Sequence, residues 1–375
     1  MCGIAGFFDK KINSKIQNKK IGKNIIDTLK LRGPDHEGML CVENHGITFL
    51  HTRLSIIDLS INANQPMTSN YGRFIITFNG EIYNYLELKK ELKCLGHNFK
   101  TSSDTEVLLT SIEQWGLDVS LNKFIGMFAF AIYDKNLKEL TLVRDRFGEK
   151  PLYYASLNDS LIFGSELKAL KAHPDWLGNI DKDSLKLYLK YSYVPSPKSI
   201  YKNVYKLSPA TYIKFKITDK QCKEILQKKW YSTQLFTKPF KGTYKEALKL
   251  TEDLINKSVN YQKISDVPIG TFLSGGIDST LITSLMQNNT STKVKTFTIG
   301  YNDKSYDESL YAKKIANHLG TEHSEWIVNE DEVVKYIPKM SKFYDEPFAD
   351  SSQVPTYLIS KFARQKVKVS LTGDA

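Results

Sequence analysis

The sequence predicts an α+β domain followed by an α/β domain with a parallel, doubly wound sheet. Two observations carry this prediction. Short strand patterns and helical patterns are mixed over residues 1–170, which favours helices layered against sheets. Strand and helix patterns then alternate from residue 244 to residue 371, which is typical of a parallel sheet. A chain of 375 residues is long enough for two domains.

In the first domain, an apolar run predicts a strand at 74–79 that ends at Gly80. Two pairs of strands are expected after it, 124–133 with 139–143 and 152–155 with 161–163. Helical apolar spacing is found at 85–94 and at 104–113.

The boundary between the domains is marked by a loss of pattern. Residues 191–197 contain two prolines and predict a loop, and periodicity is lost over 230–242. We therefore predict domains at residues 2–235 and 243–375. In the second domain we expect helices at 244–258, from near Ser279, and at 309–319, 332–343 and 356–364, alternating with strands at 269–273, 295–299, 324–327 and 367–371.

Composition limits the class of protein. Hydrophobic residues make up 41% and charged residues 25%, as in ordinary globular enzymes. The net charge of +11 comes from lysines spread along the chain without a nucleic-acid-binding motif, so we expect no nucleic-acid partner. Because no apolar run is long enough to span a bilayer and the N-terminus does not read as a signal peptide, we expect no membrane association and a cytoplasmic location.

The cysteines point to one candidate nucleophile. Cys2, Cys41, Cys94 and Cys222 form neither a C-x-x-C pair nor a metal-ligand spacing, so free thiols are expected. Cys2 follows the initiator Met1, and removal of Met1 gives one residue both a thiol and a free α-amine. The amine titrates at about 7.7–8.0 and the thiol near 8.5, so the amine can accept the thiol proton near neutral pH. This combination is typical of N-terminal nucleophile enzymes.

The segments around Cys2 resemble a known family. Residues 1–6, Met-Cys-Gly-Ile-Ala-Gly, are similar to the start of class II glutamine amidotransferases such as asparagine synthetase. Four segments match that family in order: Arg-Gly-Pro-Asp at 32–35, His-Thr-Arg-Leu-Ser-Ile at 51–56, Phe-Asn-Gly-Glu-Ile-Tyr-Asn at 78–84 and Thr-Ser-Ser-Asp-Thr-Glu at 101–106. Segments at 126–131, 144–153 and 165–170 also match. The first is interpreted as a core strand without chemistry, and the third as the end of this domain.

The resemblance implies a glutaminase site on an N-terminal nucleophile fold, an αββα sandwich. Cys2 would be the nucleophile, with the Asn79 amide and the Gly80 N–H as donors for the oxyanion. Arg53 would hold the glutamine α-carboxylate, and Asp104, with Glu81 nearby, the α-ammonium. Simpler explanations stay open: a hairpin turn at Asn79-Gly80, a helix cap at Asp104 and a surface ion pair at Arg53.

A second motif lies in the α/β domain. Leu-Ser-Gly-Gly-Ile-Asp-Ser at 273–279 follows a strand and opens a helix, where backbone N–H groups form an anion-binding nest. It lacks the Gly-Lys-Ser/Thr of a Walker A loop and resembles the pyrophosphate loop of ATP pyrophosphatases, which have a Rossmann-like fold. An ordinary glycine turn is the alternative.

By this resemblance, ATP is bound by Leu273, Ser274, Gly275, Gly276, Asp278, Ser279 and Ile299, with Thr372 and Gly373 from a later segment. Asp278 is the expected ligand of Mg²⁺ bridging the phosphates. Plain core packing is the alternative for Leu273 and Ile299.

Two further segments extend the resemblance. Asp-Glu-Pro-Phe-Ala-Asp-Ser-Ser at 345–352 resembles a segment of asparagine synthetases expected near the acyl-acceptor carboxylate, although Asp350 and Ser351 also suit a helix start. Residues 370–375 resemble the first half of the S-G-x-G-x-D-E motif, with Thr372 at the serine position. We therefore expect the synthetase half to be incomplete relative to the family.

The resemblance implies glutamine-dependent asparagine synthesis. Glutamine hydrolysis at Cys2 would supply ammonia to a β-aspartyl-adenylate made from aspartate and ATP, giving asparagine, glutamate, AMP and pyrophosphate. A homodimer is left open. So are amidation of another carboxylate, such as a sugar uronic acid, and a truncated glutaminase-only or inactive product. The intact Cys2 argues against the β-lactam synthetase relatives, which have lost glutaminase function.

Overall fold

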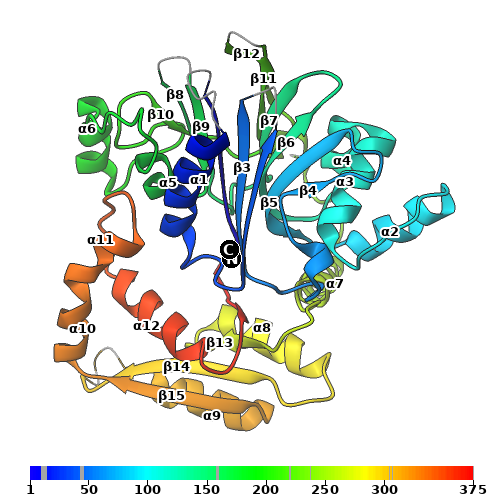
Figure 1. Cartoon of the computed structure of the whole chain (residues 1–375). Helices are drawn as coiled ribbons and strands as arrows, with labels where there is room; N and C mark the ends of the chain where they lie inside the picture. Colours follow the sequence, from blue (N-terminus) through cyan, green and yellow to red (C-terminus); the bar gives the residue numbers. More distant parts are fainter. Residues whose placement is uncertain are drawn as a thin grey trace. The chain divides into compact units, whose positions relative to one another are not determined.

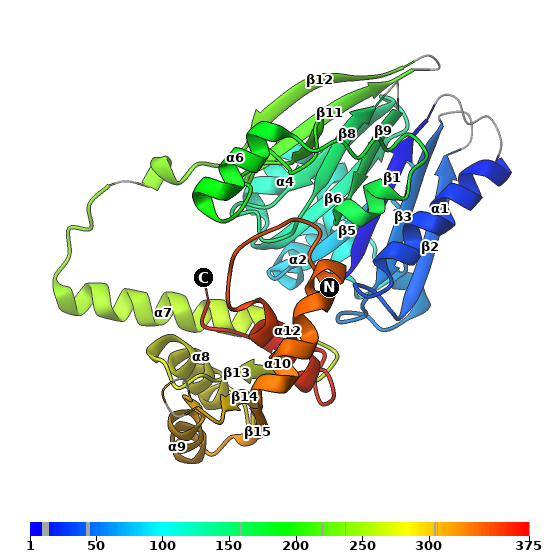
Figure 2. The same ribbon diagram turned by 90° about the vertical axis from the view of Figure 1, so that its left-hand side faces the viewer.

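The computed structural model describes residues 1–9, 15–42, 46–157, 160–218, 221–236, 238–303, 305 and 307–374. The chain forms two compact units (Figures 1 and 2). Unit 1 comprises Met1–Thr237 together with Asp345–Ala349, and unit 2 comprises Lys238–Tyr344 and Asp350–Ala375. Among the described residues, no helix is both long enough and apolar enough to cross a membrane.

Unit 1 is built on two six-stranded antiparallel sheets. The first sheet has the order β10-β8-β9-β1-β3-β2, with strands β1 (Gly3–Phe8), β2 (His36–Val42), β3 (Ile47–Arg53), β8 (Tyr153–Leu157), β9 (Ser160–Gly164) and β10 (Val204–Lys206). The second has the order β12-β11-β7-β6-β5-β4, with strands β4 (Met67–Thr68), β5 (Phe74–Ile82), β6 (Gly126–Asp134), β7 (Glu139–Arg144), β11 (Thr211–Ile217) and β12 (Cys222–Lys229).

Helices cover the outer faces of both sheets (Figure 1). Helices α1 (Lys15–Leu29) and α5 (Leu167–Lys171) pack on the first sheet. On the side of the second sheet lie α2 (Tyr85–Cys94), α3 (Asp104–Trp115) and α4 (Leu117–Lys123), and α3 packs on β5. Helix α6 (Lys182–Tyr191) and the short 3₁₀ turns at Ile61–Ala63 and Thr233–Phe236 complete unit 1. This is the predicted αββα sandwich.

The strand period explains how the layers are held together. In β1, Ile4 and Phe8 point into the core between the sheets, whereas Ala5 and Phe7 pack against the helix layer of α1 and α5. Every residue of β1 is buried, because the strand is covered on both faces. Cys2 directly precedes this central strand, so packing of β1 fixes where the N-terminus lies.

One strand is longer than predicted. β5 does not end at Gly80 but continues to Ile82, with Gly80 paired to Phe128 of β6. A Cβ at Gly80 would lie 2.2 Å from the Met127 carbonyl oxygen, so this glycine serves close strand packing rather than a turn. The hairpin turn suggested for Asn79-Gly80 is therefore wrong.

Unit 2 contains the predicted parallel sheet, of order β15-β14-β13-β16. Its strands are β13 (Ile269–Phe272), β14 (Lys295–Tyr301), β15 (Glu322–Val328) and β16 (Val369–Leu371). Its helices are α7 (Tyr244–Gln262), α8 (Ile277–Asn288), α9 (Ser309–Leu319), α10 (Glu330–Tyr336), α11 (Met340–Phe343) and α12 (Gln353–Ala363). After β13 the chain adds β14 and β15 on one side of that strand and later adds β16 on its other side. This reversal of strand order is found in doubly wound sheets.

The helix predicted at 332–343 is interrupted. A 3₁₀ turn at Ile337–Lys339 separates α10 from α11. Pro338 lies inside this turn, and proline has no N–H to continue the α-helical ladder.

Segment 345–349 leaves unit 2 and is part of unit 1. The Glu346 carboxylate accepts hydrogen bonds from Ile200 N (2.7 Å) and the Tyr153 hydroxyl (3.2 Å), and pairs with Lys206 at 2.6 Å. Asp345 accepts a hydrogen bond from Lys168 N at 2.9 Å, and Ala349 N donates to Ser192 O at 2.7 Å. Two of the three carboxylates of the predicted acceptor-site segment 345–352, those of Asp345 and Glu346, are thus engaged within unit 1.

Candidate active sites

The Cys2 thiol is held at the ends of two paired strands. β1 pairs with β3 so that Gly3 faces Thr52. The Cys2 sulfur accepts a hydrogen bond from Leu54 N at 3.4 Å and lies 3.6 Å from Leu54 O. All four cysteines are free thiols, as predicted.

Arg32, in the Arg-Gly-Pro-Asp segment, fixes the backbone of Cys2. Its Nε donates to Cys2 O at 2.9 Å, and its Nη1 pairs with the Glu166 carboxylate, also at 2.9 Å. Gly33 is needed because a Cβ there would lie 2.2 Å from the Thr52 backbone. The sequence assigned no role to Arg32 or Glu166, although both lie in segments that match the family.

One edge of β5 presents a row of backbone donors. Phe78 N donates to Gln65 Oε1 at 2.7 Å, and Ile82 N donates to Asp104 Oδ2 at 3.0 Å. Phe128 N and O instead bond Asp145 on the other side of β6, so the Gly80–Phe128 pair is a non-hydrogen-bonded one. Gly80 N–H therefore points to the same edge as its two neighbours, between Gln65 and Asp104.

The Asn79 amide is buried and unsatisfied. The residue is 1% exposed, and its Nδ2 has no hydrogen-bond partner among the described residues. A buried donor without an acceptor costs free energy, and in native proteins such groups call for a specific explanation.

Arg53 is buried and surrounded by acceptors from one loop. Its Nη1 donates to Ser60 O (2.8 Å) and to Asn64 Oδ1 (2.7 Å), and its Nη2 donates to Asp58 O. The suggested surface ion pair is therefore wrong, because Arg53 is 6% exposed and bonded to loop carbonyls. Arg53 also acts on the thiol: burial raises the pKa of Cys2, and the positive charge of Arg53 opposes part of that rise.

Two buried carboxylates lie near the thiol. Burial raises the pKa of Asp104 to about 6, opposed by hydrogen bonds from backbone N–H groups, including that of Ile82. Burial and the Asp104 charge raise the pKa of Glu81 to about 7. The suggested cap at Asp104 is wrong: the N-cap of α3 is Ser103, whose side chain accepts from Thr105 N, and Asp104 is the first helical residue. The charges of Lys150 near Glu81 and Arg53 near Asp104 offset this rise only in part, so the two carboxylates suit a ligand that carries positive charge.

The N-terminal amine is buried beside the thiol. Burial, together with the charges of Arg32 and Lys150, lowers the pKa of the Met1 amine to about 5. Burial raises the pKa of the Cys2 thiol. An amine that is neutral at neutral pH, next to a protonated thiol, can act as its base.

In unit 2, the 273–279 segment forms a turn between β13 and α8. Gly275 has φ +90°, a left-handed conformation that favours glycine. The Ser274 and Ser279 hydroxyls lie 3.1 Å apart, and Ser274 Oγ accepts from Gly276 N at 3.3 Å. Asp278, in the first turn of α8, is exposed.

Gly373 lies against the start of α8. A Cβ on Gly373 would be 2.6 Å from Ser279 N and 2.7 Å from the Asp278 carbonyl carbon. The turn after β16, which includes Thr372, thus meets the glycine turn after β13, the neighbouring strand. Leu273 packs in a cluster with Ala312 and Ala316, and Ile299 packs beside Val328 and Leu358.

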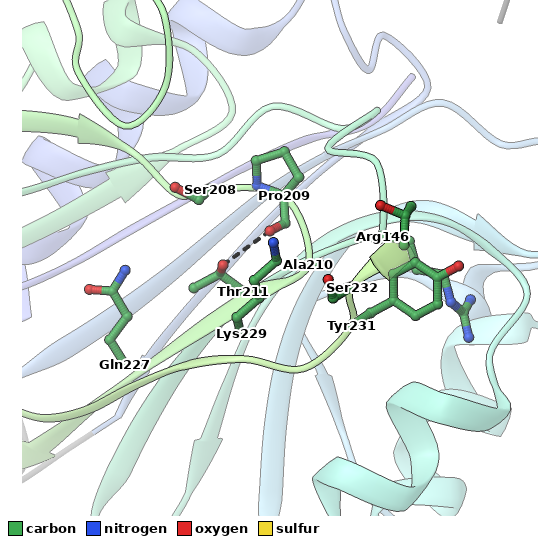
Figure 3. A pocket seen from close by; sticks show the side chains of 10 residues that line it. Arg146, Ser208, Pro209, Ala210, Thr211, Gln227, Lys229, Tyr231 and Ser232 are labelled. Atoms are coloured by element: carbon green, nitrogen blue, oxygen red, sulfur yellow. Dashed lines mark hydrogen bonds between the residues drawn. The ribbon is translucent and has the colours of Figure 1, made fainter. Parts of the chain in front are cut away.

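Two cavities in unit 1 contain none of the predicted site residues. One, of about 710 Å³, is polar and partly basic (Figure 3) and is lined by Arg146, Ser208, Pro209, Ala210, Thr211, Gln227, Lys229, Tyr231, Ser232 and Thr233. The second, of about 260 Å³, lies beside α3 and is lined in part by Lys100, Thr101 and Glu106. In the first, the Arg146 guanidinium already donates to Asn122 O at 3.1 Å.

The comparisons with known proteins identify the class of protein to which the chain belongs. Residues 1–231 match the glutamine amidotransferase domain, and residues 250–375 match the asparagine synthase family. The chain is 36% identical to asparagine synthetase [glutamine-hydrolyzing] 1 of Bacillus subtilis, over 100% of this chain and 57% of that protein. It is 37% identical to the putative asparagine synthetase [glutamine-hydrolyzing] 2 of Methanocaldococcus jannaschii, over 100% of this chain and 74% of that protein.

The chain belongs to the asparagine synthetase family. It spans little more than half the length of the Bacillus subtilis relative. A solved glutamine phosphoribosylpyrophosphate amidotransferase of B. subtilis is 15% identical, with a TM-score of 0.46, over 86% of this chain and 65% of that one.

Proposed function

We propose that unit 1 hydrolyses glutamine at Cys2 and that the protein uses the ammonia for ATP-dependent synthesis of asparagine from aspartate. The observation that carries the glutaminase proposal is the buried Asn79 amide, whose Nδ2 has no partner among the described residues. Asn79 lies in β5, the strand whose Ile82 N donates to Asp104, and the Asp104 charge acts on the Cys2 thiol. An amide without a protein acceptor is explained if its acceptor is the oxyanion of a reacting substrate.

In the proposed glutaminase reaction, the Cys2 thiol and amine act together with Asn79 and Gly80 of β5. After loss of Met1, the Cys2 α-amine takes the thiol proton, and the sulfur attacks the glutamine side-chain carbonyl carbon. The oxyanion accepts hydrogen bonds from Asn79 Nδ2 and Gly80 N–H. The C–N bond then breaks and ammonia leaves with the proton held by the amine. Water hydrolyses the remaining thioester, giving glutamate and the free thiol.

Glutamine recognition is proposed for the charged groups at the same site. Glu81 and Asp104 would bind the α-ammonium, which supplies the positive charge that this carboxylate pair needs. Arg53 would bind the α-carboxylate. Its Nη groups donate to carbonyls of loop 57–60, so glutamine would share this guanidinium with the loop or displace part of it.

For unit 2 we propose ATP binding at the turn between β13 and α8. Ser274, Gly275, Gly276 and Ser279 would surround the phosphates, with Gly373 packed against the helix start, and Leu273 and Ile299 near the adenine. The exposed Asp278 carboxylate fits a Mg²⁺ ion held partly by phosphate oxygens, because magnesium prefers such oxygen ligands. That ion would neutralise phosphate charge. The domain bounds 2–235 and 243–375, the Thr372 contact with ATP, a homodimer and a cytoplasmic location stay predictions.

The test is a Cys2→Ala variant. It should lose glutamate release from glutamine while keeping ammonia-driven, ATP-dependent release of pyrophosphate. Cys222→Ala is the matched control, because Cys222 is another half-buried thiol of unit 1. Intact mass should show that Met1 is absent from the active protein. Glutaminase activity retained by Cys2→Ala would refute the proposal.

A further inference from the structure

Lys150 is a buried lysine that the proposed reaction does not use. It is 5% exposed, and its Nζ lies 3.0 Å from Met1 Sδ. A thioether is a weak hydrogen-bond acceptor, and a lysine is seldom fully buried unless it is paired. Among the described residues, the acceptor of the Lys150 ammonium is thus the Met1 thioether, and the proposed mechanism removes Met1.

The position of Lys150 is fixed by a neighbouring carboxylate. Asp145 is fully buried, and its two oxygens accept hydrogen bonds from the backbone N–H groups of Phe128, Phe147, Gly148, Glu149 and Lys150. A loop with this many bonds to one carboxylate holds its side chains in defined places. The Lys150 ammonium is therefore a built feature of unit 1.

The ammonium acts on two groups of the glutaminase site. It adds to the effect of burial in lowering the pKa of the Met1 amine, as Arg32 also does, and it opposes the rise in the pKa of Glu81 that burial and Asp104 cause. In the opposite direction, Glu81 and Glu149 favour the charged form of Lys150, whereas burial disfavours it. The Lys150 charge thus favours the neutral form of the Met1 amine and the ionised form of Glu81.

We propose that Lys150 is a positioning residue of the glutaminase site, whose buried ammonium faces the space left by Met1 and serves both the Cys2 amine and Glu81. This inference rests on the proposed function of Cys2. After Met1 is removed, Lys150 loses its thioether contact and Glu81 becomes its principal partner. The neutral amine can then take the thiol proton, while the ionised Glu81 receives the substrate ammonium.

Other charged groups near the amine set the direction of the effect. Burial, Arg32 and Lys150 lower the pKa of the Met1 amine, and the Cys2 thiol and Glu81 raise it. We propose that the same charges act on the Cys2 amine after loss of Met1. Asp104 raises the pKa of the thiol and Arg53 lowers it. Of the groups around Lys150 itself, Glu149 and Asp145 favour its charge. Removing the Lys150 charge therefore raises the pKa of both the amine and Glu81.

The experiment compares pH profiles of glutaminase kcat/KM for the wild type, Lys150→Met and Lys150→Arg, using the full chain and intact mass to verify the same N-terminus. In Lys150→Met the acidic limb should move to higher pH by about one unit, so activity falls about tenfold on that limb and recovers at alkaline pH. Lys150→Arg keeps the charge and should keep the limb near its wild-type position. Lys89→Met is the control, because Lys89 donates to Thr101 O outside this group of residues.

The outcomes separate the two proposals. Loss of activity by the same factor at every pH, or an unmoved limb, would overturn the role of Lys150. Lys150→Gln is a second neutral variant, and failure of both neutral variants to fold would assign Lys150 to stability and overturn the inference as well. If Cys2→Ala keeps glutaminase activity, the proposed function itself fails. If Cys2→Ala is inactive and the Lys150→Met limb is unmoved, the inference about Lys150 fails alone.

Discussion

Replacing Asn79 with alanine tests the oxyanion site most directly, because the chain contains a matched asparagine. Asn79 and Asn84 are both buried, at 1% and 6% exposure. The Asn84 amide is fully used: Nδ2 donates to Lys123 O at 3.0 Å, and Oδ1 accepts from Ile125 N at 2.9 Å. Asn79 Nδ2 has no partner among the described residues. The two substitutions should therefore have opposite effects.

The magnitudes follow from these contacts. Asn79→Ala removes one proposed oxyanion donor, which typically costs about 2.7–4 kcal/mol and lowers kcat about 10²–10³-fold. It breaks no recorded hydrogen bond of the Nδ2 group, so the midpoint of thermal unfolding should change little. Asn84→Ala leaves Ile125 N and Lys123 O without their partner, which should cost about 1–3 kcal/mol of folding free energy. Its kcat per folded molecule should stay near that of the wild type.

The assay is initial-rate release of glutamate, together with thermal unfolding of the same samples. KM for glutamine should change less than kcat in Asn79→Ala, because the oxyanion exists only in the transition state and intermediate. If Asn79→Ala keeps wild-type kcat and unfolds at a lower temperature, as expected for Asn84→Ala, the amide has a structural role and the oxyanion assignment is wrong.

Three further outcomes are expected. The pKa of Glu81 is raised to about 7 in the folded protein, so this group favours folding at low pH and loses that contribution as pH rises from about 4.5 to 7. Glu81→Gln should therefore raise the unfolding free energy by about 1–3 kcal/mol at pH 8 and leave it unchanged near pH 4. The same substitution should raise KM for glutamine. Gly373→Ala should abolish the rise in unfolding temperature on adding ATP. Gly320→Ala should cost about 1–2 kcal/mol and keep that rise, because Gly320 has φ +71° and its added Cβ would meet no atom of the described residues within 4 Å. Asp145→Asn should lower the unfolding free energy by about 3–5 kcal/mol in denaturant titrations, because one buried carboxylate accepts hydrogen bonds from several backbone N–H groups. An unchanged denaturation midpoint would contradict the role of Asp145 in fixing the loop.

The layers and most elements of this fold could be predicted from the sequence, because their signals are local. Helices such as α2 and α9 have the apolar spacing that places one face on a sheet, and β13 followed by a glycine turn and α8 is a local pattern. The break in the helix predicted at 332–343 comes from the local Pro338, whereas the extent of β5 is decided by a contact between distant segments. Gly80 belongs inside β5 only because β6, a distant strand in the sequence, packs against it.

The site could be predicted in part, for the same reason. The resemblance identified Cys2, Asn79 and Asp104 as candidates, and the structure places Asp104 on the edge of β5 that carries the Gly80 N–H. The contact of Arg32 with Cys2 O spans 30 residues and that of Asp145 with Phe128 N spans 17, so neither gives a local pattern in the sequence. Lys150 was missed because a single lysine gives no local sign that it is buried.

The return of the chain at Asp345–Ala349 has a consequence for how unit 1 is completed. Its first 237 residues include Lys206 and Ile200 N, whose partner is the carboxylate of Glu346. A ribosome must therefore synthesise more than a hundred additional residues, including most of unit 2, before these groups find their partner. A fragment cut at the junction near residue 237 should consequently be a less stable protein than the same unit inside the longer chain, even though the cut removes no strand of either sheet.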